Sequence, residues 1–240
     1  MISIVIPTLN ERNRIACLLD SIVAQKIEED IEVVIADAGS TDGTREFVRT
    51  YDSKLHSIIV EGGPPAIARN RGGRASHGDP IFFIDADMSL PNPEFLHTTV
   101  TYFRLHKLGV GATPLVPEGK NGIDHFFAHV SNLIMRIAKY IRPVGAQCIV
   151  TSRETYQSSG GYPEDRILFE DHDFVAACAK VGRYGVLPLP AFFSVRRMEK
   201  EGRLLIIWKY TYAALYRMTV GPITKPIFKY EFNHEKQRTE

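Results

Sequence analysis

The chain has 240 residues, of which 44% are hydrophobic and 24% are charged, as is ordinary for a globular protein of one large domain or one domain with a subdomain. Its formal net charge of +1 argues against a dedicated nucleic-acid-binding protein, so we expect no nucleic-acid partner. The charge is uneven, because residues 196–240 contain ten Lys and Arg but five Asp and Glu, which leaves +5 there and −4 in the rest of the chain.

The N-terminus and the cysteines bear on the cellular compartment. The apolar run Ile2–Ile6 is only as long as a strand and is ended by Pro7, so we expect no secretion signal. No stretch of about 18 apolar residues is free of charges, so we expect no membrane-spanning helix. Cys17, Cys148 and Cys178 include no CxxC pair, which predicts neither a zinc site nor a disulfide framework. A reducing, cytoplasmic location follows.

Short apolar runs alternate with helical patterns through the first 90 residues. The predicted elements are a strand at Ile2–Ile6, a helix at Glu11–Gln25, a strand at Ile31–Ala36, a helix at Thr41–Tyr51, a strand at Ser57–Val60, a helix at Pro65–Ser76 and a strand at Pro80–Ile84. This alternation predicts an α/β fold with a mainly parallel sheet and helices on both faces. Ligands of such sheets bind beyond the carboxyl ends of the strands, where Pro7–Glu11, Asp37 and Asp85–Asp87 would gather.

Two acids two residues apart follow the last of these strands. On a continuing strand, Asp85 and Asp87 would point to the same side. Paired carboxylates suit Mg²⁺ or Mn²⁺ and leave coordination positions for phosphate oxygens, so we expect a nucleotide diphosphate as the ligand. A solvated turn before Pro91 and Pro93 explains the same residues, so the motif is weak on its own.

Two further segments carry polar groups to the same edge. Asp37 ends the second strand and can accept hydrogen bonds from a nucleobase, whereas Asp42 or Thr41 is more suited to capping the next helix. Arg69 and Arg71 lie on the helix after a Gly-rich segment, where either can meet a phosphate or form a salt bridge with the acid pair. Neither the GxxxxGK[ST] nor the GxGxxG order is present.

Four segments in one order, Ile4–Glu11, Asp37–Thr44, Ala68–Gly72 and Asp85–Asp87, resemble the family 2 glycosyltransferases, which have the Rossmann-like GT-A fold. The resemblance implies a donor site for a nucleoside-diphosphate sugar, and with Arg69 added we expect it to contain Pro7, Thr8, Glu11, Asp37, Arg69, Asp85 and Asp87. Within it, Asp37 would contact the base, and Asp85 and Asp87 would bind the ribose and a metal-bound diphosphate. Ala38 departs from the Asp or Gly of many members, but Asp37 remains in place.

The second half contains a Gly-Gly turn at Gly160–Gly161 and, after it, Glu170-Asp171-His172-Asp173 before a predicted helix at Phe174–Val181. The family resemblance extends to this Glu-Asp pair and implies that Asp171 is the general base of an inverting transferase. Taken alone, these acids fit equally well as charges that favour a helix N-terminus. A base on the opposite side from the leaving group would give direct displacement with inversion.

Three histidines are further candidates for chemistry at this site. His125 and His129 have i, i+4 spacing without an HExxH pattern, which indicates a helix face rather than a metal site. His172 adjoins the expected base, and we expect it to contact the acceptor or a phosphate.

The end of the chain bears on the acceptor. The basic stretch Ser194–Gly202 folds over the diphosphate or lies in solvent. Residues 204–220 combine aromatic and aliphatic side chains with Lys209 and Arg217, which suits a membrane interface; packing on the domain itself or on a second subunit in a homodimer is slightly favoured. The Gln-x-x-Arg-Trp motif of processive synthases is absent, which favours transfer of a single sugar.

These predictions give a GT-A domain at 1–195, with a nucleotide-binding half at 1–90 and an acceptor half at 91–195, followed by a basic, aromatic helical extension at 196–240. The expected enzyme is metal-dependent, uses a saccharide or a polyprenyl-phosphate or other lipid acceptor, and lies in the cytoplasm or on the inner face of the membrane. The alternative is a non-catalytic nucleotide-sugar-binding module, which would need no base. A sugar nucleotidyltransferase is disfavoured, because a Gly-rich basic loop would be expected in place of Pro7–Glu11.

Overall fold

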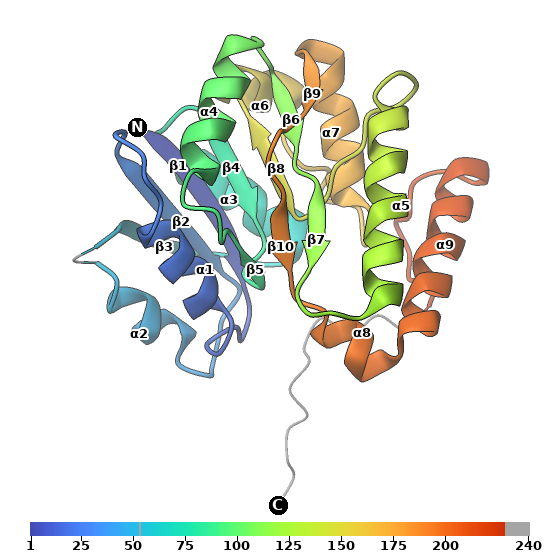
Figure 1. The fold of residues 1–240 in the computed structure, drawn as a ribbon, viewed down its shortest axis with the longest axis horizontal. Helices are drawn as coiled ribbons and strands as arrows, with labels where there is room; N and C mark the ends of the chain where they lie inside the picture. Colours follow the sequence, from blue (N-terminus) through green and yellow to red (C-terminus); the bar gives the residue numbers. More distant parts are fainter. Residues whose placement is uncertain (53, 229–240) are drawn as a thin grey trace, which may run out of the picture.

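The computed structural model describes residues 1–52 and 54–228. Its first half alternates strands and helices, as the sequence predicts (Figure 1). In chain order these are β1 (Ile2–Thr8), α1 (Ile15–Val23), β2 (Ile31–Asp37), α2 (Thr44–Arg49), β3 (His56–Glu61), α3 (Pro65–Ala75) and β4 (Ile81–Ile84). The four strands pair in parallel in the order β3-β2-β1-β4.

The second half extends this sheet and adds a smaller one. Its elements are β5 (Met88–Ser89), α4 (Phe95–Leu105), β6 (Val110–Ala112), β7 (Leu115–Pro117), α5 (Gly122–Ala138), β8 (Cys148–Thr151), α6 (Arg153–Ser159), α7 (Glu170–Val181), β9 (Tyr184–Val186), β10 (Ala191–Phe193), α8 (Arg196–Glu201) and α9 (Arg203–Thr219). Strands β8, β6 and β9 continue the large sheet beyond β4, and β5, β10 and β7 form a second sheet. Within the described residues only β8 opposes the other strands of the large sheet, so the predicted mainly parallel α/β fold is confirmed.

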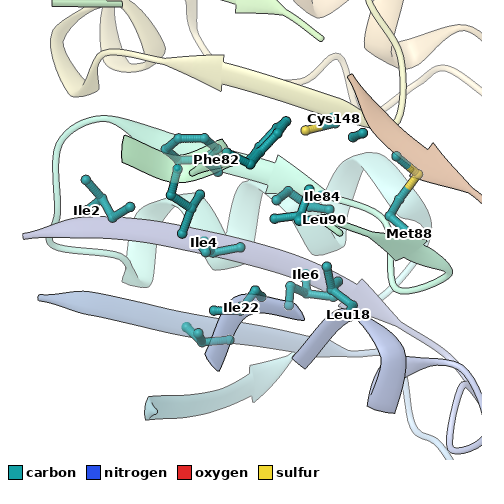
Figure 2. Packing of buried hydrophobic residues seen from close by; sticks show 14 of the residues in the cluster. Ile2, Ile4, Ile6, Leu18, Ile22, Phe82, Ile84, Met88, Leu90 and Cys148 are labelled. Carbon is teal, nitrogen blue, oxygen red and sulfur yellow. The ribbon is translucent and has the colours of Figure 1, made fainter. Parts of the chain in front are cut away.

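The core lies on both faces of the large sheet. Alternate residues of β1 point to opposite faces, so Ile4 and Ile6 join a cluster with α1 and α4, whereas Val5 joins a second cluster with α3, α6 and α7. Figure 2 shows the first cluster, in which β1 packs against Leu18 of α1 and Phe82 of β4. These side chains are fully buried, and their burial stabilises the strands whose ends form the site.

The element boundaries differ from the prediction mainly at helix starts. The first helix begins at Ile15 rather than Glu11, because Asn10 adopts a left-handed φ of 55° and the Glu11 N–H donates to the Thr44 hydroxyl over 3.1 Å. The helix predicted over 204–220 is α9, and residues 229–240 of the predicted extension lie outside the described residues. Among the helices that the structure describes, none combines the length and the hydropathy needed to cross a membrane.

Candidate donor and acceptor site

The carboxyl ends of β1 and β2 meet at one edge of the large sheet. Thr8 and Asp37 face each other in register, and the Thr8 hydroxyl donates to the Asp37 carboxylate over 3.2 Å. The Gly39 and Ser40 N–H groups and the Ser40 hydroxyl also donate to Asp37, over 2.6–3.1 Å. A carboxylate has about four acceptor positions. The buried Asp37 side chain therefore fixes the loop after β2, and its contact with a nucleobase remains a prediction that requires one of these bonds to be exchanged.

Asp42 organises the start of α2. Its carboxylate accepts the Thr44 N–H over 3.0 Å and the Arg12 N–H over 2.9 Å. The residue at the helix boundary is Gly43, so neither Asp42 nor Thr41 occupies the predicted capping position. Asp42 precedes Gly43 and accepts the N–H of Thr44, the first residue of α2. Its bond from Arg12 also connects this helix to the loop after β1.

Asp85 and Asp87 lie in a turn. Strand β4 ends at Ile84, and the Met88 N–H donates to the Asp85 carbonyl over 3.1 Å. The continuing strand that the prediction assumed ends before the two acids, so their spacing in sequence does not set their directions, and their convergence on one spot stays a prediction. Asp85 pairs with Arg69, whereas the charges of Glu11 and Arg196 act on Asp87.

The carboxyl group of Asp87 lies among other acids. Burial raises its pKa, and the charges of Asp85 and Glu11 raise it further, to about 7, although Arg196 lowers it in part. Burial also raises the pKa of Glu11, despite the Arg196 guanidinium 3.3 Å from its Oε1 atom. This edge of the sheet is therefore deficient in positive charge.

The basic stretch Ser194–Gly202 follows β10 and reaches this edge. Of its two predicted placements, over the diphosphate or in solvent, this position agrees with the first. The Ser194 N–H donates to the Asp87 carbonyl over 3.2 Å, and Arg196 pairs with Glu11. The Nε atom of Arg196 is buried without a hydrogen-bond partner. Such a donor is costly to bury unless a ligand accepts from it.

Arg69 contacts both the first turn of α7 and the edge formed by the carboxyl ends of β1, β2 and β4, which we call the donor edge after the donor site predicted there. Its side chain is 5% exposed, and its Nη2 atom donates to Asp85 Oδ1 over 2.6 Å. Its Nη1 atom lies 2.9 Å from Glu170 Oε1 and 3.5 Å from Asp171 Oδ1. Burial alone would lower the pKa of Arg69, but the charges of Asp171, Asp85 and Glu170 raise it well above its ordinary value. The predicted salt bridge between Arg69 and the acid pair is confirmed for Asp85, whereas Arg71 pairs with Glu61 at 2.9 Å.

Asp171 is a buried acid at the start of α7. Its Oδ2 atom accepts the Gln147 N–H over 3.2 Å, whereas its Oδ1 atom has no hydrogen-bond partner and only the longer ion pair with Arg69. Burial raises the pKa of Asp171 to about 6, with Arg69 opposing and Glu170 reinforcing the shift. An unsatisfied oxygen on a buried carboxylate requires an explanation, and a proton acceptor for a substrate provides one.

Gln147 is a site residue that the sequence did not indicate. It adopts a left-handed φ of 57°, and its backbone contacts both acids: its N–H donates to Asp171, and its carbonyl accepts the Asp85 N–H over 3.0 Å. Side chains other than Gly and Asn rarely adopt this conformation, so the strain marks a constrained position. Nothing in the residue type of Gln147 could have revealed this bridging role, which belongs to its backbone.

The three histidines have separate environments. His172 donates from Nδ1 to the Gly145 carbonyl over 2.6 Å, and burial lowers its pKa to about 4, so the ring is neutral near pH 7. His125 contacts the Gly119 carbonyl at 2.9 Å and is exposed, as is His129. Within residues 1–52 and 54–228, no three His, Cys, Asp or Glu residues are grouped so as to hold a metal ion.

The acids at the donor edge nevertheless fit a divalent cation that completes its coordination with phosphate oxygens. Hard carboxylate oxygens are the protein ligands that Mg²⁺ and Mn²⁺ prefer, and Mg²⁺ commonly binds through one or two carboxylates plus substrate phosphates. Burial and the neighbouring acids Asp85 and Glu11 raise the pKa of Asp87 more than Arg196 lowers it, so a bound cation would stabilise its charged form. Asp85 and Asp87 are therefore a chemically suitable pair of ligands.

Fold and site together define a class: an α/β protein of GT-A architecture with an acidic edge beyond the carboxyl ends of its parallel strands. The profile of glycosyl transferase family 2 matches residues 3–152, more than half of the chain. The chain therefore belongs to this family, which confirms the resemblance seen in its motifs.

Relatives with known names are similar over different shares of the chain. The poly(ribitol-phosphate) beta-N-acetylglucosaminyltransferase TarS of Staphylococcus aureus is 30% identical over 83% of this chain. The poly(ribitol-phosphate) beta-glucosyltransferase of Bacillus spizizenii is 35% identical over 36% of it. The chain spans 36% and 14% of these two proteins, respectively.

Solved structures share the fold. The complex of S. aureus TarS 1–349 with UDP-GlcNAc superposes with a TM-score of 0.66 at 22% identity, covering 80% of this chain and 58% of the other. The mannosyltransferase PcManGT from Pyrobaculum calidifontis, in complex with GDP-Man and Mn²⁺, superposes with a TM-score of 0.66 at 25% identity, covering 81% and 56%.

Proposed function

We propose that this glycosyltransferase moves a single sugar from a nucleoside-diphosphate sugar to an acceptor hydroxyl, with inversion, a divalent metal and Asp171 as the general base. The observation that carries the proposal is the buried guanidinium of Arg69, which contacts both the donor-side acid Asp85 and the first turn of α7. The expected base and the expected metal ligand thereby share one fixed partner, which holds donor and acceptor chemistry at a constant separation.

The donor side would bind the nucleotide diphosphate at the ends of β1, β2 and β4. Pro7, Thr8, Glu11 and Asp37 would shape the pocket for the nucleoside. Mg²⁺ or Mn²⁺, held by Asp85 and Asp87, would neutralise the charge that develops on the departing diphosphate. The relatives solved with UDP-GlcNAc and with GDP-Man and Mn²⁺ support this choice of ligands. Arg196, with a buried Nε that lacks a partner, would donate to the same phosphates.

The acceptor side would supply the nucleophile. Asp171 would take the proton of the acceptor hydroxyl while the oxygen of that hydroxyl bonds to the anomeric carbon and the bond to the diphosphate breaks. A pKa of about 6 leaves the carboxylate ionised near neutral pH and still basic enough to accept a proton. The ring of His172 is neutral, and its Nδ1 donates to the Gly145 carbonyl. Its Nε2 would therefore accept a hydrogen bond from a second hydroxyl of the acceptor substrate.

We also propose that the enzyme contacts a membrane surface through α5 and α9, which lie side by side in Figure 1. Most of the exposed large apolar side chains of the described residues belong to these two helices and the residues that follow each: Ile123, Phe126, Leu133, Ile134, Ile137, Tyr140, Ile141, Leu204, Leu205, Trp208, Tyr212, Leu215, Met218 and Val220. Residues 125–153 and 203–228 contain no acidic residue. An apolar face with only basic charges suits an anionic lipid surface.

The first test is thermal stabilisation of the protein by UDP, GDP, CDP and dTDP, each with and without Mn²⁺, in the wild type and in Asp87→Ala. A ligand that binds only the folded state raises its stability. A manganese-dependent shift for one nucleotide that is lost in Asp87→Ala supports the donor site. Equal shifts in both proteins would reject Asp87 as a ligand, and no shift for any nucleotide would favour the non-catalytic alternative.

A further inference from the structure

An arginine cluster surrounds Asp173, two residues after the expected base. Arg217 donates to Asp173 Oδ1 from Nη2 over 2.6 Å and from Nε over 3.1 Å, and Arg142 donates to the same oxygen over 3.0 Å. Arg166 donates to Asp173 Oδ2 over 3.0 Å. The three arginines come from the segment after α5, the loop before α7 and the last turn of α9. We call Arg142, Arg166 and Arg217 the Asp173 arginine cluster.

The cluster carries more positive charge than its acids balance. Asp173 is shared by all three guanidinium groups, and Asp165 contacts only Arg166. Burial alone would raise the pKa of Asp173, but Arg217, Arg166 and Arg142 together lower it. One carboxylate cannot use all the donors of three guanidinium groups, each of which has five. Several donors are therefore left for a second anion.

We propose that the Asp173 arginine cluster binds a phosphate group carried by the acceptor, so that the acceptor contains both a hydroxyl and a phosphate. Arginine donors suit phosphate oxygens, and the N-terminus of the twelve-residue α7 adds a favourable dipole. Arg142 has a side chain 54% exposed and is accessible from solvent, whereas Arg217 is 9% exposed and fixed in place.

The location of the cluster sets the geometry of the acceptor. Asp171 and Asp173 lie in the first turn of α7, with about 3 Å of rise between them but about 200° of rotation around the helix axis, so their side chains point to different sides of the helix N-terminus. The charges of Arg217 and Arg142 also act on His172, which lies between the two acids in sequence. An acceptor that extends across the N-terminal end of α7 would therefore place its phosphate at the cluster and its hydroxyl at Asp171. This inference rests on the proposed function, because it assigns the acceptor of the same site.

The phosphate has two chemical sources, a lipid-linked acceptor or a soluble polyol phosphate. The lipid source is favoured by exposed apolar neighbours of the cluster: Tyr140 and Ile141 precede Arg142, and Met218 and Val220 follow Arg217. Each of these four side chains is at least 69% exposed. The phosphate of the lipid headgroup would then contact the arginine cluster, and the acyl or prenyl chain would contact the apolar side chains beside it.

The test measures the melting temperature of the 240-residue protein in chloride, inorganic phosphate and glycerol 3-phosphate at matched ionic strength, without metal. We expect both phosphates to stabilise the wild type, and Arg142→Gln to weaken their apparent affinity about tenfold. Arg136→Gln is the matched control, because it removes the same charge from exposed α5 outside the cluster. Equal losses in both variants, or no phosphate shift in the wild type, would overturn the proposal.

A second variant separates binding from structure. Asp173→Asn removes the carboxylate that the three arginines share, so its stability falls in chloride, and phosphate should restore more stability to it than to the wild type. An equal loss in both salts would show a purely structural cluster and overturn the proposal. Arg142→Gln should keep the stabilisation by nucleotide and Mn²⁺, so failure of the phosphate site is distinguishable from failure of the donor site.

Vesicle flotation then identifies the source. Phosphatidylcholine vesicles containing polyprenyl phosphate, which presents a lipid-linked phosphate without a separate hydroxyl and so probes the phosphate site alone, are compared with vesicles containing the uncharged polyprenol. Recovery with polyprenyl phosphate alone, lost in Arg142→Gln but kept in Arg136→Gln, supports the phosphate site with a lipid-linked acceptor. Stabilisation by glycerol 3-phosphate without selective flotation supports it with a soluble acceptor.

Discussion

The two halves of the molecule are built differently. Strands β1 to β4 have four to seven residues, and β1, β2 and β4 are almost completely buried, between helices on both faces. The strands of the second half have two to four residues, and its helices α5 and α9 expose most of their large apolar side chains. The first half is a buried scaffold whose strand ends would present the proposed donor site. The second half leaves surface for an acceptor and for whatever carries it.

Arg69 is where the two halves meet. It belongs to α3 of the first half, and two of its three acidic partners, Glu170 and Asp171, belong to α7 of the second. The close approach of α3 to the sheet depends on Gly72, where an added Cβ would lie 2.3 Å from Val5 Cγ1. The position of the expected base is thereby coupled to the packing of the donor half.

The largest expected effect concerns the acceptor half alone. Asp171→Asn should lower turnover about 10³-fold, because a proton acceptor contributes roughly 10²–10⁴-fold to such a step. Nucleotide binding, measured by thermal shift with Mn²⁺, should be unchanged, since the donor edge keeps Glu11, Asp85 and Asp87. Glu170→Gln is the matched control, as it alters the other acid that Arg69 contacts on α7. Turnover that survives Asp171→Asn would reject Asp171 as the base.

The next largest effect tests the ion pairs by which Arg69 connects the two halves. Arg69→Met should destabilise the protein by about 3 to 5 kcal/mol, because it leaves Asp85, Glu170 and Asp171 without their shared cation. Arg71→Met on the same helix removes a guanidinium 40% exposed, so we expect a change of about 0.5 kcal/mol or less. Chemical denaturation measures both. Similar decreases in the free energy of unfolding of the two variants would show that the ion pairs of Arg69 do not couple the two halves.

The sequence predicted the donor half far better than the acceptor half. Buried strands such as Ile2–Thr8 and helices such as Pro65–Ala75 carry strong periodic patterns, so the order of elements through β4 was correct. Strands of two or three residues, such as Met88–Ser89 and Val110–Ala112, are too short to show a period. They form only because neighbouring strands already exist to pair with them.

The sequence likewise predicted only part of the candidate site. Acidic motifs identified Asp85, Asp87 and Asp171, because carboxylates near strand or helix ends are visible in sequence. The turn that separates Asp85 from Asp87 and the backbone bridge of Gln147 depend on tertiary hydrogen bonds. The convergence of three arginines on Asp173 likewise depends on α9 folding back on α7, which spacing along the chain does not specify. The roles of all these residues remain predictions for the experiments described.

A smaller effect follows from the pKa values of the donor edge. A carboxyl group whose pKa is raised to about 7 in the folded protein stabilises the fold below its ordinary pKa, near 4, and this contribution is lost as the pH rises through 7. His172 gives the opposite slope, because its lowered pKa costs stability as the pH falls below about 6.5. The difference between the wild type and Asp87→Asn therefore isolates Asp87.

Without metal, the free energy of unfolding of the wild type relative to Asp87→Asn should fall on the order of 1 kcal/mol between about pH 5 and 7.5. Mn²⁺ should abolish that fall, because it stabilises the ionised carboxylate. Asp42→Asn is the control: the pKa of Asp42 is lowered, since hydrogen bonds from Thr44 and Arg12 outweigh its burial, so its contribution changes only below about pH 4. If the difference in the free energy of unfolding between the wild type and Asp87→Asn did not change with pH, that result would contradict the crowding of acids at the donor edge.

The smallest effect on stability should come from the exposed face of the acceptor half. Trp208 is 60% exposed and contacts Tyr212 in a stack with centroids 5.5 Å apart, so Trp208→Ser should change the free energy of unfolding by about 0.5 kcal/mol. Leu105→Ser on α4 is the control, at 75% exposed and outside the α5 and α9 face. Flotation with vesicles containing anionic lipid should weaken for Trp208→Ser alone. If sedimentation instead shows a wild-type dimer that only Trp208→Ser dissociates, the face binds a second subunit, and the apolar exposure of the acceptor half serves assembly rather than a membrane.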